Sequence, residues 1–115
     1  MSKGLQGFLR QLRPQKGLAA WSARLTDRTL MSHCYTTWFK PSQVEQVLTR
    51  LTEAIEGLSS HNLQPTKLCW AFDRTRIYVA LRPDTACLAL FVENRPGLET
   101  SALERVLREF SAHPA

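Results

Sequence analysis

The stretch KLCWAFDRTRIYVALRPDTACLALFV, residues 67–92, decides the fold. Large apolar residues recur at every second position over most of it: Leu68, Trp70, Phe72, Ile77, Val79 and Leu81. This period is typical of β-strands, in which successive side chains point to opposite faces. The run from Ala86 to Val92 is apolar on both faces, which indicates a strand in the middle of a sheet covered on both sides. We therefore predict three strands with turns at residues 73–76 and 82–85, the second suited to Pro83.

A long amphipathic helix is predicted before these strands, over residues 42–58. Its apolar positions keep helical spacing: Val44, Val47, Leu48, Leu51, Ile55 and Leu58. The polar back that we expect to face water carries Arg50, Thr52, Glu53 and Glu56. Ser42 and Glu45 have capping-box spacing, and Pro41 is expected to precede the helix.

Shorter elements are predicted on either side. A helix is indicated over residues 5–12, with Ser2 as its cap and Pro14 as its end, and a second over residues 101–110, with Ser101 and Glu104 at capping-box spacing. Strands are predicted over residues 18–25 and about 29–35. The resulting order is helix-strand-strand-helix-strand-strand-strand-helix. It predicts one α+β domain over residues 1–115, a three-layer α/β/α sandwich around one central five-stranded antiparallel sheet.

Charge and cysteine content limit the classes of function. The formal net charge is +5, and residues 1–40 carry seven basic side chains against one acidic side chain. An electropositive N-terminal region steers anionic partners, or forms an ordinary basic surface. The three cysteines lie far apart without disulfide or zinc spacing, which favours a reducing cytoplasm. No apolar run approaches the roughly 20 residues that a membrane-spanning helix needs.

No residue set indicates catalysis, so we predict no enzyme activity, no cofactor and no metal. His33 and Cys34 are neighbours on a strand and point to opposite faces, which keeps them out of a shared catalytic site. The glycines stand singly, without a phosphate-binding loop. Arg74 and Arg76 lie at a hairpin tip, where solvated arginines are more usual than a phosphate clamp.

One aromatic segment leaves an alternative function open. Tyr35, Trp38 and Phe39 stand close together before Lys40. We expect these rings to pack over the end of the sheet, whereas exposed rings would offer a stacking platform for nucleic acid. Nucleic-acid binding would then use the basic N-terminal side chains Arg10, Arg13, Lys16 and Arg24.

The strand at residues 68–72 has no charge or proline at its centre. If it lies at the edge of the sheet, its free backbone groups must be covered or paired with another chain. Homodimerisation through this edge would pair them. Ala54 and Gly57, beside the apolar stripe of the long helix, would let a second helix approach closely.

The element order resembles that of the roadblock/dynein light chain (LC7) family over about residues 5–110. The best local matches are residues 16–20, which look like the opening of the family's first strand, and residues 67–90, which look like its three-strand end. Profilin-like and longin-like domains have related strand meanders. The family often places a glycine in the first hairpin, where this chain has Thr26-Asp27-Arg28-Thr29.

The resemblance implies a non-enzymatic, cytoplasmic scaffold or regulator. It implies a dimer, with itself or a related roadblock chain, that joins two sheets edge to edge beside paired long helices. It also implies a protein partner, with small Ras-like GTPases as the candidate class. Interface roles are carried over onto Val47, Leu51, Ala54, Leu68, Trp70 and Phe72.

Overall fold

The run that is apolar on both faces forms the central strand of the sheet. The structure, a computed structural model, describes residues 3–59, 61–63 and 66–114. Strand β5 (Cys87–Glu93) lies between β1 (Leu18–Arg24) and β4 (Thr75–Leu81), with β2 (Leu30–Cys34) and β3 (Lys67–Ala71) at the two edges. All neighbouring strands are antiparallel. Every β5 residue before Glu93 is buried, as its lack of a polar face predicts.

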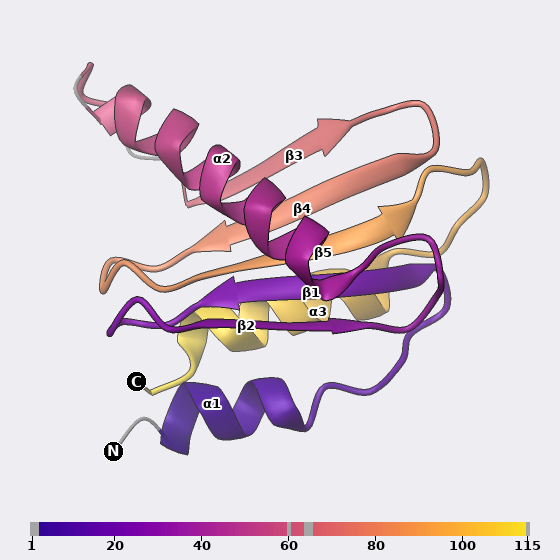
Figure 1. The fold of residues 1–115 in the computed structure, drawn as a ribbon, viewed down its shortest axis with the longest axis horizontal. Helices are drawn as coiled ribbons and strands as arrows, with labels where there is room; N and C mark the ends of the chain where they lie inside the picture. Colours follow the sequence, from indigo (N-terminus) through magenta and orange to yellow (C-terminus); the bar gives the residue numbers. More distant parts are fainter. Residues whose placement is uncertain (1–2, 60, 64–65, 115) are drawn as a thin grey trace.

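Helices cover both faces of this sheet (Figure 1). Helix α2 (Pro41–Ser59) crosses one face, while α1 (Lys3–Arg10) and α3 (Ser101–Ala112) lie on the other. The predicted α+β class, three layers and element order are confirmed.

Two hydrophobic clusters hold the layers together. Alternation along each strand sends one set of side chains to α2 and the other to α1 and α3. The cluster under α2 is built from Ala20, Val44, Leu48, Ile55, Ile77, Val79, Cys87, Ala89 and Phe91. The cluster on the other face includes Leu9, Trp21, Leu88, Leu90, Leu107 and Phe110.

The helix starts differ from the predicted caps. Helix α2 begins at Pro41, one residue earlier than predicted, and Gln43 Oε1 accepts the backbone N–H of Lys40 at 2.8 Å. The predicted Ser42–Glu45 box is wrong because Glu45 instead accepts a hydrogen bond from Ser32 Oγ on β2.

Helix α3 also starts without the predicted box. Its N-cap is Thr100, which makes no side-chain capping bond, while Glu99 Oε1 accepts from both the backbone N–H and Oγ of Ser101. The Ser101–Glu104 prediction is therefore wrong. The predicted cap of α1, Ser2, lies outside the described residues.

The β1–β2 and β4–β5 hairpins share one turn geometry. In each, an Asp carboxylate accepts a backbone N–H two residues later: Asp27 from Thr29 at 3.0 Å, and Asp84 from Ala86 at 3.2 Å. The residue between has positive φ, 70° at Arg28 and 74° at Thr85. Arg28 thus takes, in the first hairpin, a left-handed conformation that favours glycine.

Thr52 corrects the predicted polar back of α2. Arg50, Glu53 and Glu56 are exposed as expected, but Thr52 is buried. Its hydroxyl donates to the Thr49 carbonyl oxygen at 2.9 Å. A threonine can face an apolar core in a helix because the backbone of the preceding turn accepts its proton.

Candidate functional site

Strand β3 presents a free backbone edge. Its register with β4 pairs Leu68 with Val79 and Trp70 with Ile77, and the flanking bond from Phe72 N to Thr75 O is 2.8 Å. Antiparallel ladders alternate hydrogen-bonded with non-hydrogen-bonded pairs, so Leu68 and Trp70 direct their backbone groups toward β4. The backbone groups of the alternate residues, Lys67, Cys69 and Ala71, point outward from the edge of the sheet.

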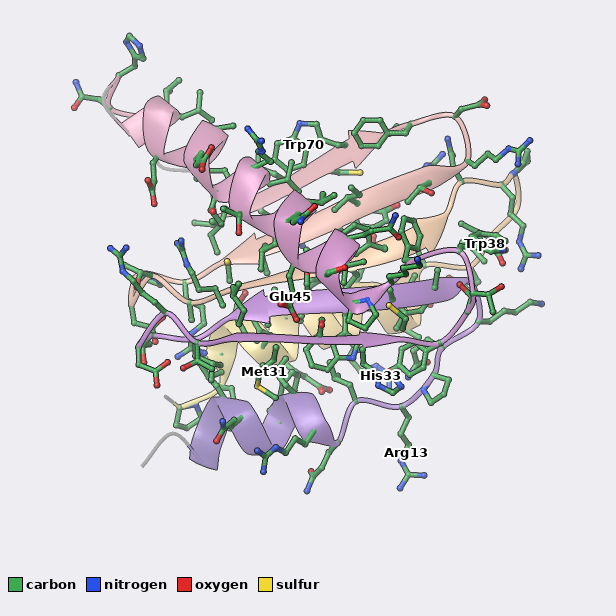
Figure 2. The ribbon with its side chains drawn as sticks, in the orientation of Figure 1. Arg13, Met31, His33, Trp38, Glu45 and Trp70 are labelled. Carbon is green, nitrogen blue, oxygen red and sulfur yellow. The ribbon has the colours of Figure 1, made fainter. Side chains whose placement is uncertain are left out.

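The side chains of β3 follow the same alternation. Leu68 and Trp70 are half-buried and pack against the cluster under α2, while Lys67, Cys69 and Ala71 are exposed on the opposite face. Trp70 lies between β3 and α2 (Figure 2). The edge therefore combines outward backbone groups with two large apolar side chains, without a charge at its centre.

The orientation of α2 follows from its contacts on the other side. Glu45 bonds to Ser32 on β2, and Glu56 lies 4.0 Å from Arg24 on β1. At 3.6 residues per turn, Glu45 and Glu56 share one flank of the helix, which therefore faces the β2 edge. The opposite flank faces the β3 edge.

That opposite flank carries the predicted interface residues of α2. By the same helical spacing it bears Val47, Leu51 and Ala54. Val47 and Leu51 are half-buried against the cluster under α2, and Ala54 is exposed. A Cβ added at Gly57 would meet nothing within 4 Å. The helix thus presents small residues and open space on its outer side.

Five of the six predicted interface residues are in one neighbourhood. Val47, Leu51, Leu68 and Trp70 pack against one cluster, and Ala54 stands exposed on the same flank of α2. Phe72 is the outlier. It lies just beyond the end of β3, is 53% exposed and belongs to neither cluster.

The aromatic segment divides into two half-buried, packed rings and one exposed ring. The Tyr35 hydroxyl donates to the Leu12 carbonyl oxygen at 3.1 Å, and Phe39 packs on Phe91 with ring centroids 5.4 Å apart. Trp38 is 55% exposed, so the prediction that all three rings pack over the sheet is wrong for Trp38.

Trp38 instead marks a surface hollow that no sequence pattern indicates. The hollow measures about 420 Å³ and lies between the β2–α2 loop and α2. Its lining joins one aromatic ring, an aliphatic side chain and polar groups: Trp38, Phe39, Gln43, Gln46, Val47 and Arg50. Trp and Arg are over-represented among the residues that dominate protein–protein binding.

The remaining sequence candidates show no catalytic geometry. His33 is exposed and meets the Tyr35 ring edge-on, while Cys34 packs on the opposite face against the cluster under α2. Burial raises the pKa of the Cys34 thiol, which lowers its nucleophilicity at neutral pH. Arg74 and Arg76 are exposed, and Arg76 Nε donates to Asn94 Oδ1 at 2.8 Å.

Two further features of the described residues concern metal sites and membrane-spanning helices. Among residues 3–59, 61–63 and 66–114, no three His, Cys, Asp or Glu side chains gather as a metal site would require. Within the same ranges, no helix is both long and apolar enough to cross a bilayer.

Comparison with solved structures gives the fold. No protein family and no curated protein matches the sequence. The structure is similar to Myxococcus xanthus MglB, with a TM-score of 0.61 and 12% identity over 82% of this chain and 80% of that chain. It is also similar to the roadblock/LC7 domain from Streptomyces avermitilis, with a TM-score of 0.60 and 11% identity over 92% and 87% of the two chains. The chain has a roadblock/LC7-like fold.

Proposed function

We propose that this chain is a non-enzymatic dimeric module of the cytoplasm that pairs with a second copy, or a related chain, through β3 and binds a protein partner. The observation that carries the proposal is the free β3 edge beside the apolar flank of α2. A second copy would bury more of the apolar surface of the two half-buried side chains of that edge, Leu68 and Trp70. The roadblock/LC7-like fold supports the same use of the edge.

Symmetry limits how two β3 strands can pair. A two-fold axis perpendicular to the sheet makes the strands antiparallel and keeps both α2 helices on one face. The register that pairs all five residues of β3 is centred on Cys69, which then lies opposite Cys69 of the other copy. Because Cys69 directs its backbone groups outward, this is a hydrogen-bonded pair with Cα atoms about 5.5 Å apart.

This register predicts a specific disulfide crosslink. Cα separations of about 4.4–6.8 Å allow a disulfide, and Cys69 is free and exposed. Mild oxidation with diamide should therefore yield a covalent dimer on a non-reducing gel. We expect Cys69→Ser to abolish the crosslink.

Cys34→Ser is the matched control, because Cys34 lies on the opposite edge strand β2. It should leave the crosslink intact. A crosslink that depends on Cys34 would contradict pairing through β3. A clean monomer by light scattering at micromolar concentration would contradict the dimer itself.

For the partner we propose a small Ras-like GTPase, the class that the family resemblance implies. The hollow beside Trp38 is the candidate contact, because it offers an exposed aromatic ring next to Arg50. This contact lies on the same side of the sheet as the α2 helices of the proposed dimer.

Trp38→Ala should abolish partner binding without unfolding the protein. The ring is more than half exposed, so the free energy of unfolding should change by about 0.5 kcal/mol or less. The measurement is affinity purification from the native host with mass spectrometry, in which a GTPase should accompany the wild type and be lost with Trp38→Ala. Leu63→Ala is the control, since Leu63 is exposed to the same degree but lies in the α2–β3 loop. Equal recovery of the GTPase with both variants would refute this contact.

Nucleic-acid binding is the weaker alternative. The rings of Tyr35 and Phe39 are engaged in packing, which leaves Trp38 alone exposed in the predicted stacking platform. Single-strand binding usually combines several stacking rings with a basic groove.

A further inference from the structure

A cleft of about 440 Å³ separates α1 from the β2 edge. Apolar side chains from three elements form its walls: Leu9 and Leu12 from the α1 end, Trp21 from β1, and Met31 from β2. His33 and Met31 lie between β2 and α1, while Arg13 extends from the coil that follows α1 and points away from the sheet (Figure 2). The Tyr35 hydroxyl accepts from Trp21 Nε1 at 3.2 Å and donates to the Leu12 carbonyl oxygen, which fixes the walls relative to one another.

The strand beside this cleft has a free edge. The bond from Tyr35 N to Ala19 O measures 2.8 Å, and the ladder pairs Trp21 with His33. By alternation, Leu30, Ser32 and Cys34 direct their backbone groups away from β1, toward the outside of the sheet. An extended chain laid along β2 would pair with these groups and send every second side chain into the cleft.

The charge around the cleft is one-sided. Arg10 lines it, and Arg13 stands exposed three residues further along. Among the residues that the structure describes, no carboxylate lines the cleft, and Glu45 bonds to Ser32 Oγ on the other face of the sheet. The carboxylate of Asp27, the single acidic residue among residues 1–40, accepts the backbone N–H of Thr29 in the β1–β2 turn.

We propose that the β2 edge and the α1–β2 cleft bind an extended acidic segment of a partner protein by strand addition. Outward backbone groups give the pairing, the apolar walls accept one aliphatic side chain, and Arg10 and the nearby Arg13 attract the carboxylates of the segment. The site is independent of the proposed dimer, because β2 and β3 are opposite edges of the sheet.

The test uses a capped heptapeptide, Thr-Glu-Thr-Val-Thr-Glu-Thr, titrated into the ¹⁵N-labelled full chain. Its Val and Glu side chains share one face of a strand, as the cleft requires. The amide signals of Leu30, Ser32 and Cys34 and the indole signal of Trp21 should shift, and these amides should exchange more slowly. Added salt should weaken the binding.

A peptide of the same composition provides the sharpest control. In Thr-Thr-Glu-Val-Glu-Thr-Thr the valine and the glutamates lie on opposite faces, so it should bind several-fold more weakly. Equal affinity of the two peptides, or no shift at the β2 amides at millimolar peptide, would overturn the proposal. Shifts of the same amides with single-stranded oligothymidylate, but not with the first peptide, would show that the site binds nucleic acid and not an acidic protein segment.

Two variants test the charge and the edge separately. The double variant Arg10→Glu with Arg13→Glu should weaken peptide binding roughly tenfold. The control, Arg74→Glu with Arg108→Glu, changes the net charge equally at exposed sites elsewhere and should have no effect.

Ser32→Pro removes an outward N–H and should abolish peptide binding, whereas Ser32→Ala should not. Loss of binding with the distant charge pair, or binding by a folded Ser32→Pro variant, would count against strand addition.

Discussion

Replacing Cys69 by proline is expected to turn the proposed dimer into monomers while leaving the fold intact. The backbone N–H of Cys69 points away from β4, so proline removes no bond of the β3–β4 ladder. In the dimer the same change removes one donor from each copy and places a ring between the paired strands. Two lost bonds at about 0.5–1.5 kcal/mol each, with the obstruction added, raise the dissociation constant roughly a hundredfold.

Analytical ultracentrifugation across a concentration series measures this change, and circular dichroism verifies the fold. Ser32→Pro is the matched control, because Ser32 holds the equivalent outward position at the centre of β2. It should leave the dimer intact. Should Ser32→Pro dissociate the dimer and Cys69→Pro preserve it, the two copies would be joined through β2 instead.

The strand order across the sheet could be predicted only in part. The absence of a polar face placed β5 in the centre, because burial on both sides removes the need for alternation. The edge position of β3 was inferred conditionally from its pattern, and its exposed alternate residues in the structure agree with it. Strand β1 is covered on both faces although it contains Ser22 and Arg24, so its polar residues gave no sign of its burial.

The candidate surfaces were harder to predict, because they depend on distant parts of the chain. Sequence spacing suggested that Glu45 caps α2, but its carboxylate instead accepts a hydrogen bond from the Ser32 hydroxyl on β2. Trp38 and Phe39 are neighbours with the same apolar character, yet only Phe39 reaches a partner ring in the core. The cleft beside β2 joins α1, β1 and β2, and no local pattern announces it.

Arg82 has a structural role that was also invisible in the sequence. It was assigned to a turn, but its side chain is only 8% exposed and reaches the end of α3. Its guanidinium donates to the carbonyl oxygens of Phe110 and His113 at 2.6 and 2.5 Å and lies 5.6 Å from the Phe110 ring centroid. The carbonyl oxygens at a helix C-terminus lack partners within the helix and favour a cation. Arg82 therefore ties the β4–β5 turn to the last turn of α3.

Arg82→Met should lower the free energy of unfolding by about 3 kcal/mol, because it leaves the half-buried carboxylate of Asp84 and the carbonyl oxygens of Phe110 and His113 without their charged donor. A loss of this size lowers the melting temperature by roughly 10–15 °C. Arg108→Met is the control on α3, where the exposed side chain should contribute about 0.5 kcal/mol or less. Equal melting temperatures for the two variants would show that Arg82 does not stabilise the protein by linking the β4–β5 turn to α3.

The same contact predicts how stability depends on pH. Hydrogen bonds from Arg82 hold the pKa of the Asp84 carboxyl below its ordinary value. A carboxyl with a lowered pKa in the folded state stabilises the protein fully above its unfolded pKa of about 3.9, and this contribution is lost as the pH falls through the folded value. The measurement is urea unfolding of the wild type and Arg82→Met at neutral and at acidic pH. The difference between their free energies of unfolding should therefore become smaller on acidification. A difference that stays constant with pH would assign the stabilisation to the α3 carbonyls alone, because those groups do not titrate.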